Sequence, residues 1–165
     1  MRRIRKVKVD KKGKVFLQWE VEIFGQKGDR IGWDDYTMSC SDLPRPEFID
    51  AMKALIQDVV SLCELPDKDA EDRITVRSVT WSYSDEDIQG AVISAQRKLY
   101  NSVAPMNINT PHKPYQPYNE ACEDPDPDMI LPEDTIERLT TLEEECQYYI
   151  DGDRAQMKLF EEGTA

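Results

Sequence analysis

The sequence predicts an α+β fold: an antiparallel sheet of about five strands with one packed helix. Apolar residues alternate at every second position between residues 15 and 23, which is typical of a strand with one buried face. Between residues 48 and 62 they recur every three or four positions, which is typical of an amphipathic helix. A proline-rich, acidic stretch further on predicts a long loop before a last helix. The 165 residues suffice for one domain with a real core.

Residues 1–103 form the predicted α+β core. Its expected strands cover residues 4–9, 15–23, 33–40, 74–83 and 86–99. The last of these alternates like a returning strand, but a helix fits it nearly as well. Within 74–83 the apolar parity changes between Val76 and Val79, which predicts a β-bulge. The predicted helix starts at Pro44 and Pro46 and ends before Pro66.

Three further segments complete the chain. Residues 104–132 contain seven prolines and many acids, and are expected to be a long loop. Residues 133–152 form the predicted C-terminal helix, which Gly152 ends as its C-cap. Residues 153–165 have no apolar period and are expected to be a flexible tail.

Charge is unevenly distributed along the chain, whose net charge is −12. Residues 1–14 hold eight Lys or Arg and one Asp, whereas residues 120–165 hold fifteen acids and three bases. Direct contact with nucleic acid is therefore not expected, except through the basic N-terminal strand. That strand carries charges on both faces, which is typical of an exposed edge strand.

No catalytic signature is present, so we expect a protein that is not an enzyme and needs no cofactor. The only histidine is His112, and no sequence feature identifies a nucleophile for it. Acidic groups could hold a divalent cation in a metal-dependent nuclease, but solvated loops are the favoured interpretation; these groups are Asp34-Asp35, Asp85-Glu86-Asp87 and Asp124-Pro125-Asp126-Pro127-Asp128.

The sequence also bears on where in the cell the protein is expected. No run of about 18 apolar residues exists and the basic N-terminus has no apolar segment after it, so neither a membrane span nor a secretory signal is expected. The four cysteines form no CxxC pair and are expected to be reduced thiols rather than zinc ligands. These observations predict a cytoplasmic protein.

The acidic second half suggests a binding surface. Carboxylates spaced along the last helix can imitate a phosphate backbone and occupy a DNA-binding cleft. The residues of this predicted acidic surface are Glu133, Glu137, Glu143, Glu144, Glu145 and Asp151. An ordinary solvated helix face is the competing interpretation, and the favoured one.

The tail holds the most informative motif. Gln156-Met157-Lys158-Leu159-Phe160 resembles the short peptide with which bacterial proteins bind the β sliding clamp of the replicase. Gln156, Leu159 and Phe160 match its most diagnostic positions, whereas Met157 and Lys158 depart from the usual leucine and Ser or Asp. Two adjacent apolar side chains in a polar tail also fit a peptide that docks into a preformed groove. The resemblance implies that Gln156, Met157, Leu159 and Phe160 bind a partner.

A looser resemblance covers most of the chain. Segments from Val79 to Ser84, Gly90 to Ala95, Asn109 to Pro114 and Gly152 to Gln156 resemble uncharacterised phage and prophage proteins of Gram-positive bacteria. This resemblance implies a phage-encoded protein acting on its host. The sequence therefore predicts an accessory protein that binds host replication or recombination machinery through its tail. The alternative is an acidic inhibitor of a host defence nuclease, of the anti-CRISPR or DNA-mimic type.

Overall fold

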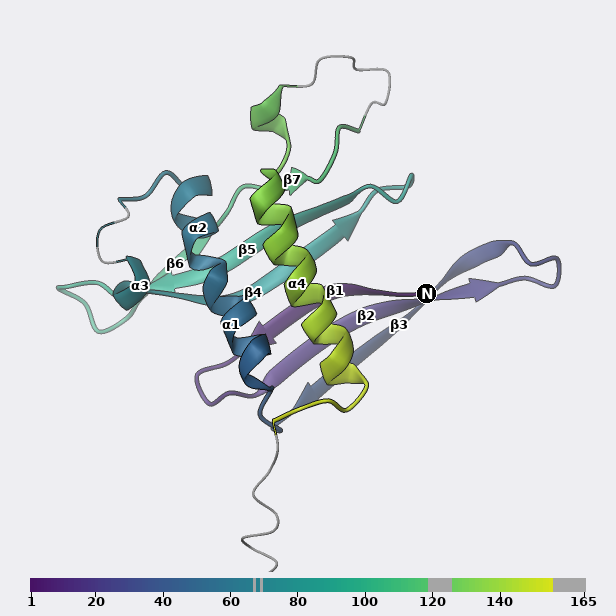
Figure 1. Ribbon diagram of the computed structural model, residues 1–165, viewed down its shortest axis with the longest axis horizontal. Coiled ribbons are helices and arrows are strands. Elements are labelled where there is room, and N and C mark those ends of the chain that lie inside the picture. The colour runs from purple at the N-terminus through teal and green to yellow at the C-terminus, as the bar shows by residue number, and fades with distance from the viewer. Residues whose placement is uncertain (67, 69, 119–125, 156–165) are drawn as a thin grey trace, which may run out of the picture.

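The computed structural model describes residues 1–66, 68, 70–118 and 126–155. It confirms the α+β class: a twisted antiparallel sheet carries helices on one of its faces (Figure 1). The strands are β1 (Arg2–Val9), β2 (Val15–Phe24), β3 (Arg30–Cys40), β4 (Ile74–Tyr83), β5 (Gln89–Arg97), β6 (Met106–Asn109) and β7 (Lys113–Pro114).

The order of neighbouring strands is β3-β2-β1-β4-β5-β6, and β7 also pairs with β5. The sheet thus has two more strands than predicted, and both come from the segment expected to be loop. The basic strand β1 is central rather than an edge strand, because it pairs with β2 on one side and β4 on the other. Residues 86–99 contain the strand β5, not a helix.

The period-two pattern survives in the burial of the strands. Val15 and Leu17 face the helices and are fully buried, whereas their neighbour Phe16 lies on the opposite side of the sheet and is half-buried. The predicted bulge of β4 is confirmed as a register shift between Val76 and Ser78. A second shift in β1, between Ile4 and Lys6, keeps Ile4 and Val7 both in the core.

The helical layer on the sheet consists of one stretch of chain between β3 and β4 and another stretch after β7. The predicted single helix is divided at Leu55 into α1 (Pro46–Ala54) and α2 (Ile56–Leu62). The short α3 (Ala70–Arg73) leads into β4, and α4 (Glu133–Ile150) packs beside α1 (Figure 1). None of the described helices is long and apolar enough to cross a membrane.

The core lies between this layer and the sheet. Its largest fully buried side chains come from both: Trp81 and Leu17 from strands, Phe48 from α1, and Tyr149 and Leu142 from α4. Phe48 and Tyr149 pack ring against ring, with centroids 5.9 Å apart. In the part of the chain that the structure describes, no helix covers the other side of the sheet, which we call the open face (Figure 1).

Candidate functional site

The C-terminal end of α4 is the point from which the tail begins. Gly152, with φ +95°, ends the helix as predicted: its amide donates to the Tyr149 carbonyl, and the Asp153 amide donates to the Tyr148 carbonyl. These two bonds form a Schellman motif, in which the left-handed residue is usually glycine.

Residues 153–155 then dock on the domain, which corrects the predicted start of the free tail. The Arg154 guanidinium donates to Asp42 at 2.7 Å, and the Ala155 amide donates to the Leu43 carbonyl at 3.0 Å. Asp153 pairs with Arg45 at 3.2 Å. The chain is therefore fixed to the β3–α1 connection up to Ala155.

The partner-binding residues predicted from the sequence follow directly after this anchor. They are Gln156, Met157, Leu159 and Phe160, and they lie outside the described residues.

Two of the six residues predicted to form the acidic surface, Glu143 and Glu145, are directed into the domain instead. Glu145 is 6% exposed, and its carboxylate accepts two hydrogen bonds of 2.7 Å from the Arg45 guanidinium. Glu143 is also turned toward the sheet. Glu133, Glu137 and Glu144 are exposed, whereas Asp151 is paired with Arg2 at 2.9 Å. Glu133, Glu137 and Glu144 thus remain exposed without an ion pair among the described residues, which is half of the six carboxylates in the predicted surface.

Glu143 belongs to a polar network inside the domain. Its Oε1 accepts from Gln89 Nε2 at 2.7 Å and lies 3.4 Å from the Tyr115 hydroxyl, which in turn accepts from Trp81 Nε1 at 3.0 Å. Burial raises the pKa of Glu143 from 4.5 to about 7, although the hydrogen bonds from Gln89 and Tyr115 oppose this shift. Burial and the nearby Glu143 also raise the pKa values of Tyr83 and Tyr115.

His112, for which the sequence identified no partner, lies against Ser82. Its Nε2 is 2.7 Å from the Ser82 hydroxyl, above Gly90, where a Cβ atom would come within 2.7 Å of the same nitrogen. A nucleophilic serine needs a base that a third group orients. Among the described residues, no hydrogen bond to His112 Nδ1 is found. The pair is therefore a surface hydrogen bond at the edge of the open face.

The acidic groups proposed as metal ligands are dispersed. The strand register places Asp35 opposite Glu20 and Asp34 opposite Val21, so the two point to different faces. Asp87 is held by Arg3 at 3.1 Å and Arg30 at 2.8 Å, and Asp124 lies outside the described residues. In residues 1–66, 68, 70–118 and 126–155 no group of three His, Cys, Asp or Glu is arranged to hold a metal ion.

The described cysteines are free thiols. Cys146 is buried, and burial raises its pKa well above the ordinary value; Cys40 and Cys63 are half-buried. Cys122 lies outside the described residues.

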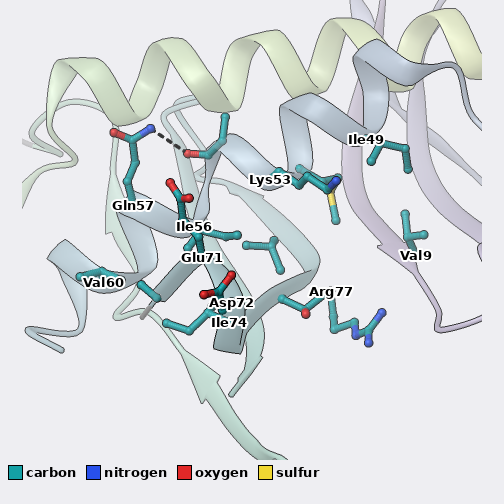
Figure 2. Close-up of a pocket in the computed structure, with 15 residues that line it drawn as sticks. Val9, Ile49, Lys53, Ile56, Gln57, Val60, Glu71, Asp72, Ile74 and Arg77 are labelled. Carbon is teal, nitrogen blue, oxygen red and sulfur yellow. Dashed lines mark hydrogen bonds between the residues drawn. The ribbon is translucent and has the colours of Figure 1, made fainter. Parts of the chain in front are cut away.

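A groove of about 1000 Å³ lies between α1–α2, α3 and the neighbouring ends of β1 and β4 (Figure 2). Its floor is apolar and includes Val9, Ile49, Ile56, Val60 and Ile74. Its rim is charged with both signs, from Lys53, Glu71 and Asp72. The floor suits an apolar group, whereas the mixed rim selects neither anions nor cations.

The open face has two electrostatically different ends. At one end, near the β2–β3 hairpin, the Glu20 carboxylate accepts a hydrogen bond from Arg3 at 3.1 Å and forms an ion pair with Arg5 at 3.0 Å. The Arg3 guanidinium also lies 3.6 Å from the centre of the Trp33 ring. The positive charges of this half of β1 are thus neutralised within the domain.

The other end, which we call the lysine end, comprises Lys6, Lys8, Lys11, Arg77 and the polar side chains between them. The register aligns Lys8 with Phe16 on β2 and Ser78 on β4. The basic strand is visible in the sequence but its pairing with β4 is not, because β4 lies some seventy residues away in the chain.

A scan against protein-family models and searches of curated proteins and of solved structures found no match to this chain.

Proposed function

We propose that this chain is a phage-encoded, non-enzymatic accessory protein that binds the sliding clamp of its bacterial host, in the host cytoplasm. The binding peptide consists of Gln156, Met157, Leu159 and Phe160. The observation that carries the proposal is the match of Gln156, Leu159 and Phe160 to the clamp-binding pattern.

The anchor at residues 153–155 supports the proposal. Because Arg154 and Ala155 are tied to Asp42 and Leu43, the peptide begins at a defined point on the surface of the domain. A short segment that begins at a fixed point needs less ordering on binding than one on a long linker. The folded domain would then be carried to the clamp in a restricted orientation.

The first prediction is a loss of clamp binding in the double variant Leu159→Ala/Phe160→Ala. Each buried apolar side chain contributes roughly 1.5–3 kcal/mol before ordering costs, so the parent should bind with micromolar affinity and the variant at least tenfold more weakly. Lys158→Asp, which moves the peptide toward the family pattern, should bind equally well or more tightly. The measurement is calorimetric titration of the full chain into purified clamp from a Gram-positive host.

The matched control is Glu161→Ala/Glu162→Ala, two alanine replacements directly after the motif, which should bind like the parent. Circular dichroism should show an unchanged fold in every variant, since the motif follows the anchor. Absence of heat and of any shift in gel filtration at high micromolar clamp would refute the proposal.

Ionic strength separates this function from the acidic-inhibitor alternative. A peptide with two apolar anchors should lose little affinity between 50 mM and 500 mM salt, whereas charge mimicry should weaken steeply. The burial of Glu143 and Glu145 favours the clamp proposal, because it removes two carboxylates from the surface that the alternative requires.

A further inference from the structure

The lysines of the open face form no ion pair with any residue that the structure describes. Among the described residues, every side-chain cation in an ion pair is an arginine; those arginines are Arg2, Arg3, Arg5, Arg30, Arg45, Arg138 and Arg154. Within the described part of the chain, Lys6, Lys8 and Lys11 form no such pair, although the sequence holds 33 acids and 21 bases. Unpaired positive charge on one sheet face of an acidic protein attracts anionic ligands to that face.

A shallow depression lies at this lysine end. Its volume is about 400 Å³, and Lys8, Lys11 and Arg77 line it together with Ser94, Asn107 and Asn109. A second depression of about 230 Å³ shares Lys11, Arg77 and Gln96 with it and adds Lys98. The two form one continuous track across the ends of β1, β4 and β5.

The track has one carboxylate, and that group is already engaged. Asp10 Oδ1 accepts from the backbone amides of Lys12 at 2.8 Å and Lys14 at 2.9 Å, which closes the β1–β2 turn. Four cations therefore face one carboxylate whose hydrogen bonds are directed into its own turn.

Polar side chains beside the cations present donors to the solvent. Ser94 donates to Asn109 Oδ1 at 2.7 Å, and Gln96 donates to Asn107 Oδ1 at 3.3 Å, so both asparagine oxygens are used. The Nδ2 groups of Asn107 and Asn109 have no partner among the described residues. Free amide donors next to cations suit hydrogen bonding to the edges of unpaired bases.

An aromatic ring completes the surface. Phe16 is half-buried on the open face and lies directly opposite Lys8 in the β1–β2 register. On sheet surfaces that bind single strands, aromatic side chains stack with the bases while nearby cations contact the phosphate backbone of the nucleic acid. A duplex, whose bases are already stacked, cannot use this ring.

We propose that the lysine end of the open face binds single-stranded nucleic acid, with phosphates along Lys8, Lys11 and Arg77 and a base stacked on Phe16. This proposal does not depend on the clamp-binding peptide. A clamp ligand with such a face would hold an exposed strand close to the clamp.

The test is fluorescence anisotropy of labelled twelve-residue oligo(dT) and oligo(rU), and of a twelve-base-pair duplex, with the full chain at 50 mM salt. We expect micromolar binding of one or both single strands and at least fivefold weaker binding of the duplex. About three phosphate contacts predict a slope near −2 for log K against log salt on single strands. Selectivity between oligo(dT) and oligo(rU) would define which nucleic acid is the ligand, and either result supports the site.

Two variants locate the site. Lys8→Glu/Lys11→Glu should weaken binding at least tenfold, whereas the matched control Lys27→Glu/Lys53→Glu, with the same change of net charge at two positions outside the track, should weaken it less than threefold. Phe16→Ala should weaken single-strand binding at least threefold while leaving its salt dependence unchanged. Equal losses in both charge variants, equal affinity for the duplex, or no binding to either strand would overturn the proposal, and clamp binding would be unaffected by any of these outcomes.

Discussion

Replacing Arg138 with methionine is expected to lower the free energy of unfolding by about 3–5 kcal/mol, because it leaves a buried carboxylate without its counter-charge. Asp58 on α2 is 2% exposed. Its two oxygens accept hydrogen bonds of 2.7 Å from Nε and Nη2 of Arg138 on α4, and Oδ1 also accepts from Thr135 at 2.7 Å. The pair ties α2 to α4, so its loss should be felt by the whole helical layer.

The control is the same substitution at an exposed pair. Arg30→Met removes one of the two partners of Asp87, whose side chain is 43% exposed and keeps its ion pair with Arg3, and should cost no more than about 1 kcal/mol. The double variant Asp58→Leu/Arg138→Met should recover most of the loss, because it removes both charges together. Urea denaturation followed by circular dichroism measures all three. A loss at Arg138 no larger than that at Arg30 would contradict the burial argument.

Local patterns predicted those parts of the fold whose stability is decided locally. The alternation from Val15 to Ile23 gave β2, the parity change gave the bulge of β4, and Gly152 gave the end of α4. Each of these features depends on residues that are close together in the sequence, because the alternation of a strand and the end of a helix follow from local backbone geometry.

Features decided by distant pairing were missed. β6 is four residues long and β7 two, and both exist only because the edge of β5 offers hydrogen bonds. Pro105 and Pro111 flank them and Pro114 lies within β7, and these prolines made the segment look like loop. β1 looked like an edge strand because both its faces are charged, yet Glu20 on β2 neutralises one half of it.

The two errors in the predicted acidic surface have a signal in the sequence. Glu143 lies four positions after Leu139 and three before Cys146, and Glu145 lies three after Leu142 and four before Tyr149. Both therefore flank the apolar stripe of α4. The sequence does not show which residues form hydrogen bonds with these carboxylates inside the domain; they are Arg45 for Glu145 and Gln89 for Glu143.

Glu143→Gln is expected to stabilise the protein at neutral and alkaline pH, because burial makes the ionised form of this carboxyl costly. The pKa of Glu143 is raised from 4.5 to about 7 in the folded state. Between these two values the folded protein holds a proton that the unfolded chain has released, so the free energy of unfolding falls as pH rises. The penalty is absent below pH 4.5, is complete above about pH 7, and amounts to roughly 2–3 kcal/mol.

Glutamine keeps an acceptor for Gln89 and carries no charge, so the variant should lack this fall and exceed the parent most at pH 8. Thermal or urea unfolding at half-unit steps from pH 5 to pH 8 measures the difference. The matched control Glu137→Gln changes an exposed carboxylate of the same helix and should keep the parent's slope. Parallel curves for the parent and Glu143→Gln would show that the Glu143 carboxylate is ionised in the folded protein throughout, and that the network around Tyr115 tolerates its charge.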